Sequence, residues 1–151
     1  YGKDKISMNR EEAALKQTVK FTRKDAREFL MQTVFQMDAQ KELDVSHLEK
    51  YLADRKFGTQ TAYVNTVLHK MLENIEEIDS MINAVSDGWS TSRMAKPDLA
   101  ISRVAAAEIL YADDVPQAVA INEAVNLSKL YGTEQSPKFI NAVLGKIVKK
   151  L

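Results

Sequence analysis

The chain contains no cysteine, and this absence excludes several kinds of chemistry together. Disulfide bonds, zinc sites built on thiolates and cysteine nucleophiles are all ruled out, and such a composition fits a reducing compartment. Glycine and proline are scarce as well, with five and three residues in 151, so regular structure can run for long stretches. No apolar run is long enough to cross a bilayer. We therefore expect a cytoplasmic protein that makes no use of a membrane.

The sequence also lacks the motifs of common catalytic sites. It has no H-E-x-x-H, no glycine-rich phosphate loop and no G-x-S-x-G. His47 and His69 are its only histidines, and neither has another histidine or a carboxylate at the spacing of a metal site. Asp113 and Asp114 are adjacent, but just before Pro116 they are typical of a turn. The sequence thus predicts a protein that is not an enzyme and that holds no metal or cofactor.

Charge is balanced overall but unevenly distributed along the chain. The 21 lysines and arginines match the 21 aspartates and glutamates. Residues 1–27 carry eight basic and four acidic side chains, whereas residues 38–87 carry five basic and ten acidic ones. A neutral protein can bind nucleic acid through a local basic patch, and the N-terminal end is the candidate region. The alternative is that the uneven charge has no role.

Apolar residues recur with the period of an α-helix through most of the chain, and no strand-like alternation of useful length interrupts them. The sequence therefore predicts an all-α fold of about seven helices. The expected helices cover 22–39, 46–56, 59–85, 97–111, 116–131 and 136–147, with shorter ones at 11–19 and 90–94. Residues 1–20 form a predicted N-terminal extension, partly mobile or a short helix, and residues 21–151 form one helical domain.

The last two predicted helices meet at a tight joint. Pro116 opens the first of them, and Gly132 stops it, as a glycine beyond the last turn commonly does. Ser136 and Pro137 have the residue types of an N-cap and of a first helical position. The apolar stripe of the first helix is expected to contain Val119, Ala120, Ala124, Leu127 and Leu130.

The start of the 22–39 helix is one candidate RNA surface. Four residues recur at helical spacing beside the apolar stripe, next to Arg23: Lys24, Arg27, Met31 and Phe35. Cationic groups can hold phosphates while an aromatic ring offers its face to an unpaired base. The alternative interpretation makes Phe35 a core residue and leaves the basic side chains solvated.

The start of the last helix is a second candidate. Gln135 and Lys138 offer hydrogen bonds and charge, and the free N–H groups of a helix start favour an anion. Phe139 lies at the margin of the apolar stripe, where it can face either an RNA base or the core. The sequence leaves both interpretations of Phe139 open.

Three segments of the chain carry a resemblance to a known family. AINEAVNLSKLYG followed by SPKFINAVLGKI, near the C-terminus, resembles the closing signature of the NusB family of transcription antitermination factors. TRKDAREFLMQTVFQMD, at 22–38, resembles the opening helix of that family, and WSTSRMAKPDLAISRVAAAEILYADDVP, at 89–116, resembles its middle. The segments follow in family order over about residues 21–148, and the resemblance implies two small helical bundles packed together.

The resemblance also implies a function. Members of this family bind boxA, a short single-stranded RNA element, with the ribosomal protein NusE, within the RNA polymerase antitermination complex on ribosomal transcripts. Carried over by position, the RNA-binding residues are Arg23, Lys24, Arg27, Phe35, Gln135, Lys138 and Phe139. The basic cluster is interrupted by Asp25, and Gln135 replaces an acidic residue of some relatives, so we expect weak RNA affinity without the partner.

Further polar residues match the middle and closing segments. Asp98 and Arg103 match family positions near the region of RNA and partner contact, and we assign them to partner binding. Asn122 and Glu123 belong to the closing signature and are expected on the buried side of their helix, bonded to backbone or to Arg103.

Two other functions remain open. NusB-like domains also occur as the RNA-binding part of ribosomal RNA cytosine methyltransferases, and this chain could be such an accessory domain. A helical interaction module that ignores RNA is the third interpretation. The sequence also leaves the oligomeric state open, a homodimer included.

Overall fold

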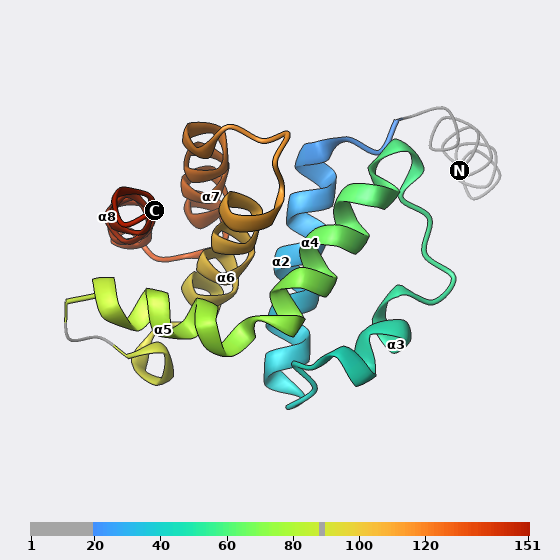
Figure 1. Ribbon diagram of the computed structural model, residues 1–151, viewed down its shortest axis with the longest axis horizontal. Coiled ribbons are helices and arrows are strands. Elements are labelled where there is room, and N and C mark those ends of the chain that lie inside the picture. Colours follow the sequence, from blue (N-terminus) through green and yellow to red (C-terminus); the bar gives the residue numbers. More distant parts are fainter. Residues whose placement is uncertain (1–19, 88–89) are drawn as a thin grey trace, which may run out of the picture.

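The computed structural model describes residues 20–87 and 90–151, and within them the chain is helical without any strand (Figure 1). The α-helices are α2 (Arg23–Ala39), α3 (Leu48–Leu52), α4 (Thr61–Glu73), α5 (Ile75–Val85), α6 (Lys96–Tyr111), α7 (Gln117–Tyr131) and α8 (Ser136–Lys149). Short 3₁₀ turns precede α3, α4 and α6, and these are η1 (Val45–His47), η2 (Gly58–Gln60) and η3 (Thr91–Arg93). The predicted all-α fold is confirmed. The predicted helix at 11–19 and nearly all of the predicted extension 1–20 lie outside the described residues.

The predicted start of α2 is confirmed by its cap. The Thr22 hydroxyl accepts a hydrogen bond from the Asp25 N–H at 3.1 Å, and the Asp25 carboxylate accepts one from the Thr22 N–H at 2.9 Å. This capping box satisfies two of the backbone donors that a helix start leaves free. It also explains an acidic residue within the basic cluster, because a carboxylate stabilises the N-terminal end of a helix.

The predicted long helix at 59–85 is in fact two helices, α4 and α5, which separate at Asn74. The Asn74 side-chain amide donates to the Lys70 carbonyl oxygen at 2.8 Å, a local bond that competes with continued helix. The apolar stripe continues on both sides of the break, so the periodicity alone does not reveal it. The predicted 46–56 helix is also shorter, because α3 ends before Asp54, whose φ of 60° no helix accommodates.

The apolar stripe predicted for α7 is partly wrong. Ala120, Ala124 and Leu127 are buried as expected, but Val119 and Leu130 face solvent, and Leu130 is 73% exposed. The stripe that faces the core is therefore narrower than the apolar composition of α7 suggests. No α-helix within the described residues is long and apolar enough to cross a bilayer.

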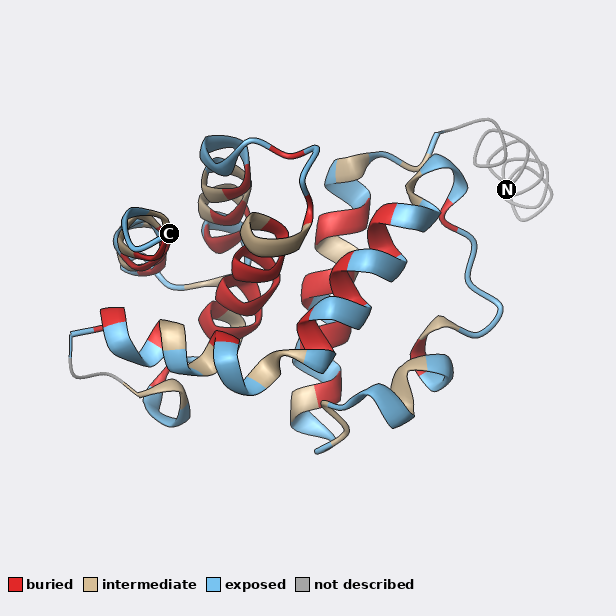
Figure 2. Ribbon diagram, viewed as in Figure 1, coloured by how far each residue is buried: buried red, intermediate tan, exposed pale blue. Residues whose placement is uncertain are grey.

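Helix α6 lies at the centre of the fold and contacts α2, α4, α5, α7 and α8. Residues 98–108 are buried in one unbroken run, as expected for a helix that is apolar on nearly every side. Figure 2 shows this continuous burial along α6. In Figure 1, α2, α3 and α4 lie on one side of α6, and α7 and α8 lie on the other. These are the two packed groups of helices that the resemblance implies, and α6 contacts both.

Candidate nucleic-acid interface

Arg27 lies inside the protein and not on the surface where the sequence predicts it. The residue is 7% exposed, and its Nε donates to the two Glu108 carboxylate oxygens at 2.9 and 3.1 Å. The Tyr63 hydroxyl donates to the same carboxylate at 3.0 Å. Burial alone lowers the pKa of Arg27, but the bonds to Glu108 outweigh it and raise that pKa, so the guanidinium stays charged. Moving Arg27 toward a phosphate would leave Glu108 unpaired in the interior.

Arg103 is also buried, and its guanidinium group bonds to carboxylates of this same chain. Its Nε and Nη2 donate to the two carboxylate oxygens of Asp79 at 2.9 and 2.8 Å, and its Nη1 donates to Asp38 at 3.1 Å. These bonds tie α6 to α5 and to the end of α2. The expected bond from Asn122 or Glu123 to Arg103 is therefore wrong, and Asn122 is exposed rather than buried.

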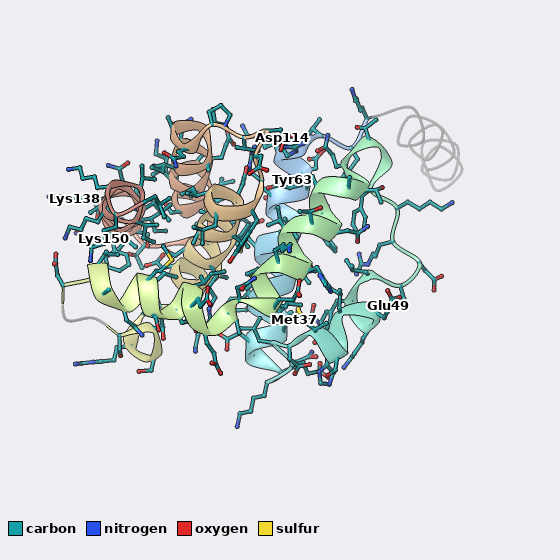
Figure 3. The ribbon with its side chains drawn as sticks, in the orientation of Figure 1. Met37, Glu49, Tyr63, Asp114, Lys138 and Lys150 are labelled. Carbon is teal, nitrogen blue, oxygen red and sulfur yellow. The ribbon has the colours of Figure 1, made fainter. Side chains whose placement is uncertain are left out.

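Arg23 is half-buried and turns toward α4. Its Nε donates to the Gln60 side-chain oxygen at 2.6 Å, and its guanidinium carbon lies 4.0 Å from the centre of the Tyr63 ring. A longer ion pair of 3.6 Å joins it to Asp114, which Figure 3 shows near Tyr63 at the same end of the molecule. These three contacts fix Arg23 at the edge of the fold and away from Phe35.

Lys24 and Phe35 remain on the surface of α2. Phe35 is 40% exposed, so the interpretation that makes it a core residue is wrong. Lys24 is exposed, and within the described residues its ammonium group has no hydrogen-bond or ion-pair partner. Helical spacing puts these two residues on one stripe with Glu28 and Gln32 between them. An exposed cation, with no partner among the described residues, and an exposed ring therefore occupy the two ends of one helix face.

Tyr131, the last residue of α7, contacts the middle of that stripe. Its hydroxyl donates to the Glu28 carboxylate at 2.8 Å and accepts from the Gln32 side-chain amide at 2.9 Å. The residue is 36% exposed. The sequence predicts no role for Tyr131, because the apolar residues around it in α7 suggest a core stripe.

The joint between α7 and α8 fixes the second candidate region. The Ser136 hydroxyl accepts from the Thr133 N–H at 2.9 Å, so Ser136 caps the loop and is itself the first residue of α8. A side chain on Gly132 would collide with Ser136, which explains glycine there without any unusual φ. Gln135 is exposed and Phe139 is half-buried at the start of the helix. Phe139 packs against the core and keeps part of its ring accessible, so both interpretations of this residue stay open.

A cavity of about 300 Å³ opens between the starts of α6 and α8. Its lining consists of Arg93, Met94, Ala95, Asp98, Gln135, Ser136 and Phe139. Asp98 is buried, and within the described residues its Oδ1 has no hydrogen-bond partner. Asp98 lies in the first turn of α6, where the helix start is partly positive. Asp98, Gln135 and Phe139 thus line the same cavity.

Lys138 is exposed but stands apart from this cavity lining. Figure 3 shows it at the outer edge of α8, away from α2. The seven predicted RNA residues therefore divide into four groups in the fold. Lys24 and Phe35 share a face of α2, Gln135 and Phe139 line the α6–α8 cavity, and Lys138 lies beyond them, while Arg23 and Arg27 are committed to internal contacts.

Each histidine lies beside a carboxylate, a contact that the sequence does not predict. His69 lies 2.9 Å from the Glu73 carboxylate one turn further along α4, and His47 lies 2.9 Å from Asp44. Within the described part of the chain, no group of three or more histidine, aspartate or glutamate side chains is placed to hold a metal ion.

Comparison with known proteins gives a consistent result. The model of the NusB family matches residues 24–149. The transcription antitermination protein NusB of Alkaliphilus oremlandii is 39% identical over 130 residues, which cover 85% of this chain and 94% of that protein. The protein of the same name from Acetivibrio thermocellus is 41% identical over 128 residues, covering 84% and 88%.

Solved structures agree with the sequence relatives. NusB of T. maritima is similar at a TM-score of 0.78 and 28% identity, covering 87% of this chain and 94% of that one. A structure of the antitermination factors NusB and NusE in complex with dsRNA is similar at a TM-score of 0.73 and 25% identity, covering 85% and 97%. A family model that spans most of the chain, together with relatives near 40% identity, leads to one conclusion: this chain belongs to the NusB family.

Proposed function

We propose that this chain is a non-catalytic transcription antitermination factor that binds boxA-type single-stranded RNA together with the ribosomal protein NusE. The observation that carries the proposal is the combination of an exposed Phe35 on α2, a half-buried Phe139 on α8 and, on α2, an exposed Lys24 that has no ion-pair partner among the described residues. The names of the relatives support the antitermination role. The similar NusB complex with NusE and dsRNA supports an RNA and a protein partner.

Single-stranded RNA suits these side chains better than a duplex does. Unpaired bases can splay out and stack on aromatic rings, whereas paired bases keep their faces covered. Phe35 and Phe139 supply rings, Lys24 supplies charge for a phosphate, and the Gln135 amide can donate and accept toward a base edge. Lys138 adds a second, more distant phosphate contact. We assign Arg23 and Arg27 a supporting role, because their guanidinium groups hold the start of α2 in place.

The protein partner would contact the start of α6. Among the described residues nothing bonds to the Asp98 Oδ1 atom there, and Asp98 lines the same cavity as Phe139. A donor from NusE can satisfy that oxygen, since a buried acceptor without a bond is costly. Arg103 contributes indirectly, by holding α6 against α2 and α5. RNA and protein contacts on neighbouring surfaces reinforce each other through effective concentration.

This function implies work on nascent ribosomal transcripts beside RNA polymerase, and hence a cytoplasmic location. The methyltransferase accessory domain is less well supported, because the chain covers 94% and 88% of two antitermination relatives that have no such enzyme part in their names.

A titration of fluorescently labelled RNA tests the proposal. A boxA oligonucleotide and a scrambled one of equal composition are each titrated with this protein, with and without purified NusE, while anisotropy is followed. We expect tight binding only for boxA with NusE present, and a loss of about tenfold or more for Phe139→Ala if a base stacks there. Equal binding of both oligonucleotides, or no binding of either with NusE, would contradict the proposed function.

A further inference from the structure

Tyr131 joins the two parts of the proposed RNA surface. Its hydroxyl is bonded to Glu28 and to Gln32, which lie four residues apart on the exposed stripe of α2. Lys24 precedes Glu28 on that stripe by one turn, and Phe35 follows Gln32 by one turn. The Tyr131 hydroxyl therefore meets α2 between the exposed cation and the exposed ring.

In the other direction, Tyr131 leads directly into the joint before α8. Gln135 and Phe139 follow it at four and eight positions, across the loop that Gly132 and Ser136 hold tight. A strand of RNA that contacted both Phe35 and Phe139 would therefore pass the end of α7.

The ring of Tyr131 is both accessible and held in place. It is 36% exposed, and among residues 20–87 and 90–151 neither it nor Phe35 nor Phe139 stacks on another ring. The hydroxyl has its donor and an acceptor position engaged by α2, so the side chain has little rotational freedom to lose when a base arrives. The bond to Glu28 raises the pKa of the hydroxyl, which keeps it protonated and keeps the bond intact.

We propose that Tyr131 is a third stacking ring of the RNA surface and takes the base that lies between those at Phe35 and Phe139. This inference rests on the proposed function and adds one residue and one nucleotide position to it. Every nucleobase has a face, so Tyr131 contributes affinity with little sequence preference. Glu28 positions the ring but carries a negative charge beside the RNA path, which makes it a residue that weakens binding.

The direct test is a photocrosslink. A boxA oligonucleotide carrying 4-thiouridine at one position at a time is bound to the protein with NusE, irradiated, and the crosslinked peptide identified by mass spectrometry. We expect one internal position to crosslink to the peptide that contains Tyr131. Crosslinks at Phe35 and Phe139 with none at Tyr131, from any position, would overturn the inference while leaving the proposed function intact.

Substitutions separate stacking from mere support of the fold. Tyr131→Phe keeps the ring and loses the two hydrogen bonds, whereas Tyr131→Leu loses the ring as well. We expect Tyr131→Leu to weaken RNA binding by about tenfold and Tyr131→Phe by no more than about threefold. Tyr111→Leu, at the far end of α6, is the matched control and should bind RNA like the parent protein.

The free energy of unfolding is measured for each variant, so that a loss of RNA affinity caused by a destabilised fold is distinguished from the loss of a stacking contact. Equal losses of RNA affinity for Tyr131→Phe and Tyr131→Leu would show that the hydroxyl bonds, and not the ring, matter, and stacking would be refuted. Normal RNA affinity for Tyr131→Leu would also refute it. A parent protein that fails to bind boxA with NusE present would refute the proposed function itself, and this inference with it.

Discussion

Arg27 and Glu108 lie 81 positions apart in the sequence and form a buried ion pair that joins the start of α2 to the end of α6. The Tyr63 hydroxyl completes the bonding of the carboxylate from α4. Three helices thus meet at one charged group in the interior, and the arginine that the sequence assigns to RNA is used there instead.

Breaking this pair from one side should be costly. Arg27→Ala leaves Glu108 charged, buried and short of partners, and we expect a loss of about 3–5 kcal/mol in the free energy of unfolding. Urea denaturation followed by circular dichroism measures this. The triple variant Arg27→Leu, Glu108→Leu and Tyr63→Phe removes every unpaired group, so it should be more stable than Arg27→Ala alone. A triple variant as unstable as Arg27→Ala would contradict this account.

The capping box of α2 predicts a dependence on pH. The backbone hydrogen bond from Thr22 holds the pKa of Asp25 below its ordinary value of 3.8. Because the folded-state pKa is depressed, this carboxylate adds stability above pH 3.8 and the contribution is lost as the pH falls through the lower folded-state value. Asp25→Asn should therefore be less stable than the parent protein at pH 7, with the difference shrinking below pH 3.8. Urea denaturation across a pH series measures it, and a constant difference would contradict it.

The five glycines include a pair for a controlled comparison. Gly132→Ala forces a methyl group against the Ser136 side chain and the Ser128 carbonyl oxygen, so we expect a loss of about 1–3 kcal/mol. Gly145→Ala, inside α8 with open space around it, should stabilise the protein by about 0.5–1 kcal/mol. Thermal unfolding of both variants gives the signs. A neutral Gly132→Ala would mean that the α7–α8 joint relaxes freely.

Lys24 should contribute one phosphate contact. Lys24→Ala is expected to reduce the slope of log affinity against log salt concentration by about 0.7 for a single strand. Anisotropy titrations with boxA RNA and NusE at several salt concentrations measure the slope. Lys70→Ala, exposed on α4, serves as the control and should leave the slope unchanged. An unchanged slope for Lys24→Ala would remove this residue from the RNA path.

Glu28 should oppose RNA binding. Glu28→Gln removes its negative charge but keeps an oxygen that can accept from Tyr131, so we expect RNA affinity to rise about two- to fivefold at low salt, with the gain fading as salt screens the charge. The same RNA titration measures it. Glu76→Gln, exposed on α5, loses an equal charge elsewhere and should have no effect. A weaker complex for Glu28→Gln would show that the carboxylate, and not the ring it holds, is what the RNA needs.

The sequence predicts helices well where an apolar stripe coincides with a capping signal. α2 begins after Thr22, as predicted, and α7 ends before Gly132. The helix predicted at 97–111 is α6. The break at Asn74 escapes prediction because the apolar stripe continues across it and the deciding bond is a single side-chain amide.

The candidate site is harder to predict than the fold. Periodicity identifies a stripe beside the core, but it does not show which basic residue pairs with a buried carboxylate from a distant part of the chain. Arg27 and Lys24 therefore look alike in the sequence, and only the position of Glu108 in the fold distinguishes them. Tyr131 is hard to predict for the opposite reason, because it belongs to a helix whose pattern is mostly apolar. It is held at the surface by Gln32 and Glu28 of α2, which lie 99 and 103 positions earlier in the chain.

The central position of α6 couples the unfolding of the two groups of helices. Buried charged pairs fasten it at Glu108 to α2 and at Arg103 to α2 and α5, while its alanine-rich sides pack against the remaining long helices. Neither group of helices can detach without exposing this shared element. Denaturation should therefore proceed as a single cooperative transition. Fluorescent labels attached to α2 and to α8, in place of tryptophan fluorescence, should report the same midpoint of unfolding.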